Sequence, residues 1–116
     1  MFDLHVAPGF DTGAHYHTKI EETFYVLEGT LALRLGDRVI EGTPGTFLFI
    51  PIGTVHGISN KGPAPGRLLL TASPSGHEKY FEELAAMVAS GPPNPDALAA
   101  LRLKYDTVQL QTLTAK

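Results

Sequence analysis

The sequence predicts an all-β protein, an antiparallel sandwich or barrel, that is followed by a short helical tail. Two observations lead to this prediction. Short runs of apolar, aromatic and β-branched residues recur up to Ser73, and the 12 glycines and 9 prolines fall at intervals along the chain rather than in one tract. After Ser75 the pattern changes, and apolar residues recur at the spacing of a helix.

Seven runs are expected to form strands. In chain order they are FDLHVA, ETFYVLE, TLALRL, RVIEG, TFLFIP, HGIS and RLLLTAS. Leu35–Arg38 is expected to form a hairpin turn, because its central Gly36 and Asp37 accept the backbone conformations that tight turns require. Asn60–Gly66 is expected to be a surface loop, because its prolines cannot lie inside a central strand.

Two helices are predicted after the strands, near Gly76–Ala89 and Pro95–Lys104. Ser75 lies three residues before Glu78, which is the spacing of a capping box, so Ser75 is expected to cap the first helix. Asn94 is expected to cap the second helix, because it precedes a proline that is well suited to the first helical position.

The tail is expected to belong to the same domain as the strands, because alone it has too few apolar residues for a core. We therefore predict a single domain over residues 1–116, with the barrel at about 2–73 and the helical tail at about 75–106. Alternating apolar residues in YDTVQLQTLT predict a final strand within residues 107–113.

The composition argues against several classes of function. The net charge is −3 and no cluster of lysines and arginines is present, so a nucleic-acid partner is not expected. No apolar run reaches the roughly 18 residues of a membrane helix, and the first residues do not resemble a signal peptide. We therefore expect a cytoplasmic protein that has no membrane partner. Without cysteine, the chain has no disulfide, thiolate nucleophile or sulfur ligand.

Three histidines and a glutamate are candidates for a metal site. On a strand His15 and His17 point to the same face, because side chains alternate with a period of two. A turn through Thr18–Glu21 would bring the chain back antiparallel and place Glu22 beside them, and His56 could supply a fourth ligand. Imidazole and carboxylate groups suit Fe(II), Mn, Ni, Cu, Co or Zn. The simpler alternative is a polar strand end whose imidazoles face water.

The two stretches that hold these residues resemble the two signature motifs of the cupin superfamily. The first motif reads Gly, five residues, His-x-His, three or four residues, Glu, six residues, Gly; the second reads Gly, five residues, Pro-x-Gly, two residues, His, three residues, Asn. All spacings are met in this chain. The matching residues are Gly9, His15, His17, Glu22 and Gly29 in the first motif, and Gly45, Pro51, Gly53, His56 and Asn60 in the second.

The resemblance implies a small jelly-roll-type β-barrel that holds one divalent transition metal per chain, with Fe(II) favoured. The ligands that it implies are His15, His17, Glu22 and His56. Glu22 is preferred to Glu21 because only Glu22 has the six-residue spacing to Gly29, and it is also a candidate acid or base. Glu21 is expected to be solvated or to contact a ligand without binding the metal itself.

Apolar residues on the inner face of so small a barrel are expected to line a substrate pocket. The candidates, which would otherwise be ordinary core residues, are Phe24, Phe47, Phe49 and Ile58. Two further histidines are not expected to take part. His5 is out of phase with the apolar residues of its strand, and His77, in the first turn of a predicted helix, is expected to be solvated.

The function that the resemblance implies is that of a metal-dependent oxygenase or other oxidoreductase. Its substrate would be a small apolar or aromatic organic molecule. The arrangement of barrel and tail is similar to that of bacterial quercetin-2,3-dioxygenase-like cupins, a resemblance that does not identify a substrate. Two alternatives stay open, because a fold does not determine an activity. One is a metal-dependent isomerase or cyclase without redox chemistry, and the other is a non-enzymatic module that binds a metal or a small molecule.

A homodimer is also expected. Only one strand precedes Gly9, where a closed barrel usually has more, so a strand edge should lack a partner. The predicted tail also carries an apolar stripe that a small barrel would not fully cover, made of Phe81, Leu84, Met87 and Val88. Exchange of Phe2–Val6 or Thr107–Leu113 between two chains would meet both needs.

Overall fold

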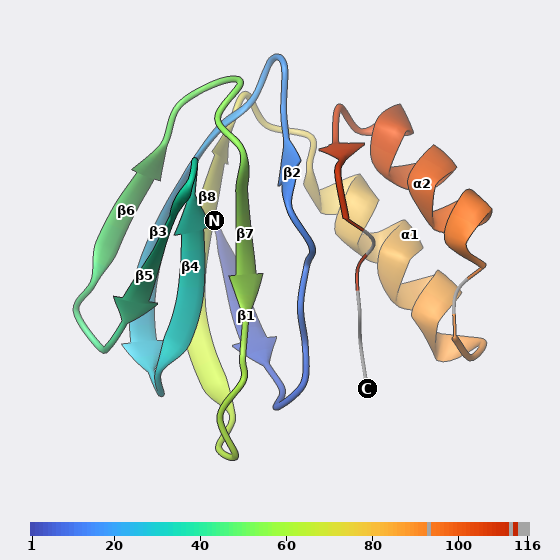
Figure 1. The fold of residues 1–116 in the computed structure, drawn as a ribbon. Coiled ribbons are helices and arrows are strands. Elements are labelled where there is room, and N and C mark those ends of the chain that lie inside the picture. The colour runs from blue at the N-terminus through green and yellow to red at the C-terminus, as the bar shows by residue number, and fades with distance from the viewer. Residues whose placement is uncertain (93, 112, 114–116) are drawn as a thin grey trace.

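The structure is a computed structural model that describes residues 1–92, 94–111 and 113. Within these residues it contains nine strands and two helices (Figure 1). The strands are β1 (Phe2–Val6), β2 (His15–Tyr16), β3 (Glu21–Glu28), β4 (Leu31–Leu35), β5 (Arg38–Gly42), β6 (Phe47–Ile50), β7 (His56–Ser59), β8 (Gly66–Ser73) and β9 (Val108–Gln109). The helices are α1 (Glu78–Ala89) and α2 (Pro95–Lys104). None of the described helices is long and apolar enough to cross a membrane.

Two antiparallel sheets make up the body of the molecule. One has the strand order β1-β8-β3-β6 and the other the order β5-β4-β7-β2-β9. The two sheets face each other as in a double-sheet jelly roll, and the helices lie at one side of them, next to β2 and β9 (Figure 1). The predicted fold class, an all-β jelly-roll-type barrel with a C-terminal helical tail, is confirmed, and every predicted run contains an observed strand.

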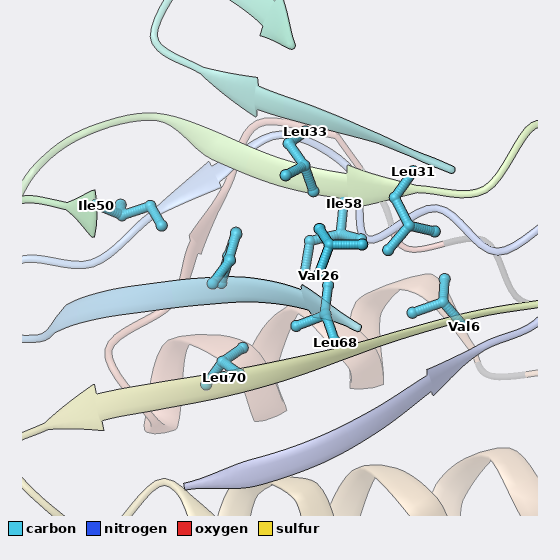
Figure 2. Close-up of a cluster of buried hydrophobic side chains, with 9 residues drawn as sticks. Val6, Val26, Leu31, Leu33, Ile50, Ile58, Leu68 and Leu70 are labelled. Atoms are coloured by element: carbon cyan, nitrogen blue, oxygen red, sulfur yellow. The ribbon is translucent and has the colours of Figure 1, made fainter. Parts of the chain in front are cut away.

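The core lies between the two sheets (Figure 2). It is formed by alternate residues of six strands, because side chains on a strand point to opposite faces in turn. Its buried members are Val6, Phe24, Val26, Leu31, Leu33, Ile50, Ile58, Leu68 and Leu70. Each such side chain, when fully buried, stabilises the fold by about 1.5–3 kcal/mol. This rigid interior holds the strands that carry the candidate ligands.

The helices begin at positions that the sequence predicts only in part. Asn94 caps α2 as expected, since its side chain accepts hydrogen bonds from the backbone N–H groups of Asp96 and Ala97. The prediction that Ser75 caps α1 is wrong. The N-cap of α1 is His77, which makes no side-chain capping bond, so the helix begins two residues later than predicted. The ring of His77 is buried and packs against the ring of His17.

The strand edges are only partly as expected. β1 is an edge strand that pairs with β8 of the same chain, and β9 pairs with β2 rather than covering β1. The final strand is thus Val108–Gln109, shorter than the predicted 107–113, of which residue 112 lies outside the described residues. The homodimer stays a prediction. The single-domain organisation of the chain also stays a proposal, supported by tail residues that line the cavity of the barrel.

Candidate metal centre

His15, His17, Glu22 and His56 come together at one point between the sheets. One ligand atom from each lies within 4.8 Å of those of the other three. The four side chains are all buried, with exposed fractions of 8% or less. Glu21, the alternative to Glu22, is exposed as expected and is absent from the cluster.

Three of the four residues lie on strands, which belong to both sheets, and His17 directly follows β2. His15 on β2 lies directly opposite His56 on the neighbouring strand β7. Glu22 lies on β3 of the other sheet, where its strand partners are Ile50 and Ala72. The turn after His17 carries the chain across the barrel from one sheet to the other, so β2 and β3 are not strand partners. Glu22 reaches the histidines from the opposite wall.

Backbone carbonyls fix the tautomer of all three histidines. Each Nδ1 atom lies 2.8 Å from a carbonyl oxygen, which can only accept a hydrogen bond. The pairs are His15 with Gly13, His17 with Asp106, and His56 with Thr54. Nδ1 therefore carries the proton in each neutral ring, and the lone pair of Nε2 is left for a metal, as is usual for histidine ligands.

The Glu22 carboxylate faces two of these lone pairs at short range. Its Oε1 atom lies 3.0 Å from Nε2 of His56 and 2.5 Å from Nε2 of His17. Nε2 of His17 is buried, and it has no aligned hydrogen-bond partner among the described residues. Acceptor atoms packed this closely require a cation between them, either a proton or a metal ion. The donor set and its spacing therefore fit a single divalent ion.

The electrostatics of the site favour the metal-binding forms of Glu22 and His15. Burial alone would raise the pKa of the Glu22 carboxyl, but contacts with His17 and His56 outweigh it and hold this pKa well below its usual range. Burial, together with the nearby His56, lowers the pKa of His15 well below its usual value. For His17, burial is outweighed by the Glu22 carboxylate, which raises the pKa of the imidazole. Glu22 is therefore held ionised and His15 neutral.

A cavity of about 310 Å³ opens beside the four residues. Phe24 and Ile58 line it, and their contact with a substrate stays a prediction. Phe47 and Phe49 do not, and this part of the prediction is wrong. They lie on β6, where the alternate residue Ile50 is buried, so both phenylalanines point outward and are 61% and 46% exposed. The run TFLFIP is apolar at both phases, which hides the inward direction.

The tail forms a wall of the cavity, and the tail residues that line it were not predicted from the sequence. His77, predicted to be solvated, is 6% exposed, and its ring centroid lies 5.5 Å from that of His17. Tyr80, Arg102 and Thr107 also line the cavity. The apolar stripe of α1 that suggested a dimer instead faces this space, through Phe81, Leu84 and Val88. The helical spacing marked the stripe, but nothing local indicated what it packs against.

Asp106 links the tail to the metal cluster. Its backbone carbonyl accepts the hydrogen bond from His17 Nδ1, and its carboxylate accepts hydrogen bonds from the backbone N–H groups of Thr18 and Lys19. Its φ of 58° is left-handed, a conformation that aspartate tolerates better than most residues do. His5, by contrast, is largely exposed, as expected.

A jelly-roll barrel that gathers three histidines and a glutamate at its interior is the architecture of a metal-binding cupin. Residues 2–72 match the family model described as "Cupin domain". The chain therefore belongs to the cupin family. The match ends before α1, so the helices that wall the cavity lie outside the matched region.

Three known proteins illustrate the range of relatives. The chain is 30% identical over 94 residues to the tetracenomycin polyketide synthase protein TcmJ of Streptomyces glaucescens, a match that covers 81% of this chain and 61% of that protein. It is 45% identical over 42 residues to quercetin 2,3-dioxygenase of Bacillus subtilis, over 36% of this chain and 12% of the enzyme. A sugar phosphate isomerase of the cupin superfamily from Silicibacter pomeroyi has a similar structure, with a TM-score of 0.58 and 26% identity over 63% of this chain and 48% of that one.

The chain thus spans less than two thirds of the length of each of these relatives. Their names describe different kinds of protein: one a polyketide synthase protein, one a dioxygenase and one an isomerase. The comparisons agree on a cupin domain with a candidate metal site, and they do not agree on one reaction.

Proposed function

We propose that the chain is a metal-dependent oxygenase that acts on a small apolar or aromatic organic substrate. His15, His17, Glu22 and His56 would hold one divalent transition metal, with Fe(II) favoured. The observation that supports this most is the convergence of three Nε2 lone pairs and a carboxylate beside a largely apolar cavity. The similarity to quercetin 2,3-dioxygenase over 42 residues adds support.

The ion, when bound, would supply a Lewis acid and redox centre for the reaction of a substrate with oxygen. The chain's own residues set the conditions. Phe24, Ile58 and the stripe on α1 give the cavity apolar walls that orient an organic molecule and limit access of water. Glu22 is also a candidate acid or base. Its lowered pKa makes it a weak base, so we assign it to holding the metal.

Oxygen uptake tests this function. We expect the protein, purified without chelator and loaded anaerobically with Fe(II), to consume oxygen in step with loss of quercetin or a smaller phenol. Zn(II)-loaded protein should not do so, because zinc has no redox chemistry. Substrate conversion of equal rate under argon would contradict an oxygenase and support a metal-dependent isomerase or cyclase. The similarities to a polyketide synthase protein and to a sugar phosphate isomerase favour that second candidate.

A further alternative is a non-enzymatic module that binds a metal or a small molecule. It would bind the metal without converting any substrate, with or without oxygen. Three other features stay proposals of the same kind: a small-molecule partner, a cytoplasmic location and a homodimer. The dimer has some support from the outer face of the first sheet, where Tyr25, Phe47 and Phe49 are exposed side by side on β3 and β6.

Metal affinity is expected to fall as the pH is lowered. In the metal-free protein Glu22 raises the pKa of His17 above its ordinary value of 6.5, so His17 takes up a proton at a higher pH than a free imidazole does. That proton competes with the metal, and each displaced proton weakens binding by about tenfold per pH unit below this pKa. Competition of Zn(II) with a chromophoric chelator between about pH 8 and pH 5 measures this effect. Affinity that stays constant to pH 5 would contradict the assigned ligands.

A further inference from the structure

Arg102 is a buried cation without an anionic partner. Its side chain projects from α2 and is 1% exposed. Nη1 donates a hydrogen bond to Oε1 of Gln109 at 3.2 Å, while Nε has no partner in the described part of the chain. No carboxylate of the described residues forms a salt bridge with it.

Such an arrangement is unfavourable unless something else satisfies it. A guanidinium remains charged in proteins, even though burial lowers the pKa of Arg102. Burying a charge without a partner is among the most costly events in folding. Tyr80 lies beside the guanidinium, but burial raises the pKa of its hydroxyl, so this group is neutral and does not balance the charge. An anion bound in the cavity would do so.

The guanidinium belongs to the same cavity as the metal cluster. Arg102 lines that cavity together with His15 and Tyr80. Its hydrogen-bond partner Gln109 lies on β9, directly opposite His15 on β2. A molecule in the cavity could therefore contact the guanidinium at one end and the metal cluster at the other.

The net charge of the cavity also favours an anionic ligand. Among the described residues that line it, Glu22 is the one carboxylate and Arg102 is the one permanent cation. With a divalent ion on the four ligands the cavity would carry a net charge of about +2. An anionic molecule would reduce this charge, whereas a neutral one would leave it buried and uncompensated.

We propose that the cavity takes an organic anion with an apolar body. Its anionic oxygen, that of a carboxylate or a phenolate, pairs with the Nε and Nη groups of Arg102, and its body lies against Phe24, Ile58 and the stripe on α1. This inference rests on the proposed function only in assuming that a small organic molecule occupies the cavity. It narrows the substrate class from apolar molecules in general to those with an acidic oxygen.

Benzoate and its neutral analogue benzamide are suitable probes, because they differ mainly in charge. Calorimetry with metal-free and Zn(II)-loaded protein should show benzoate binding at least about tenfold more tightly than benzamide. The preference should disappear in Arg102→Met and be partly kept in Arg102→Lys, which keeps the charge but not the planar fork. Arg38→Met is the matched control, because Arg38 is exposed on β5 and should have no effect.

An NMR measurement on the unaltered protein tests the proposal without depending on whether a variant folds. The Nε–H resonance of Arg102 should shift when benzoate is added and should not shift with benzamide. Equal binding of the two probes, or a preference that persists in a folded Arg102→Met protein, would overturn the proposal. A preference that appears only with Zn(II) and survives Arg102→Met would assign the anion to the metal instead. A preference that depends on Arg102 in a protein that binds no metal would support this inference and refute the proposed function.

Discussion

The double substitution His15→Ala and His56→Ala is expected to abolish metal binding. The two rings face each other across β2 and β7, with centroids 4.3 Å apart, and together they supply half of the ligand atoms in the cluster. The remaining His17 and Glu22 would then bind each other rather than an ion. Metal analysis of protein purified without chelator should fall from about one ion per chain to near zero.

Two single variants serve as controls for this result. His5→Ala removes an exposed histidine and should leave the metal content unchanged. Glu21→Gln should do the same, whereas Glu22→Gln should weaken binding, because only Glu22 reaches the cluster. Full metal content in the folded double variant would refute the site, and loss of metal in Glu21→Gln would refute the assignment of Glu22.

Gly29→Ala is expected to destabilise the fold strongly. Gly29 connects β3 to β4 with a φ of +78°, where a side chain adds about 1–2 kcal/mol of strain. A Cβ atom there would also lie 2.9 Å from the Cα of Gly66 and from the carbonyl oxygen of Pro65. Both are backbone atoms and cannot move without displacing the start of β8. We expect the free energy of unfolding, measured in urea, to fall by about 3 kcal/mol or more.

Gly36→Ala provides the matched control for that variant. Gly36 also has a positive φ, of +64°, but a Cβ atom added there would meet nothing within 4 Å. It should therefore show the backbone strain alone, about 1–2 kcal/mol. The difference between the two variants isolates the contact with Gly66 and Pro65. Equal losses in both would mean that the close approach does not constrain the fold.

The strands and the four clustered residues were predictable because their signals are local. Short apolar runs between turn residues mark strands wherever they pair, and the spacing from His15 to Gly29 sets Glu22 apart from Glu21. The path of the chain between His17 and Glu22 was not predictable. Whether the turn after His17 stays in one sheet or crosses to the other depends on which partner β3 finds, and those partners, β6 and β8, are distant in sequence.

The burial of residues in the tail was likewise not predictable from the sequence. A histidine in the first turn of a helix is usually solvated, but His77 is buried because the helix lies against the cavity of the barrel. Arg102 lies on a helix with little amphipathic pattern, so its burial has no signature in the sequence. Phe47 and Phe49 are apolar residues that were predicted to face inward but are exposed. Apolar side chains at both phases of an edge strand cannot all point inward.

The position of Asp106 constrains any attempt to give this barrel a different tail. Its carbonyl orients a ring of the metal cluster, while its carboxylate holds the two residues that follow that ring. A chimera that replaced the tail to recruit new substrates would therefore also disturb the coordination chemistry, unless the transplanted segment supplied an equivalent residue in a left-handed conformation. Selectivity and metal affinity would then have to be optimised jointly, starting from the junction at Asp106.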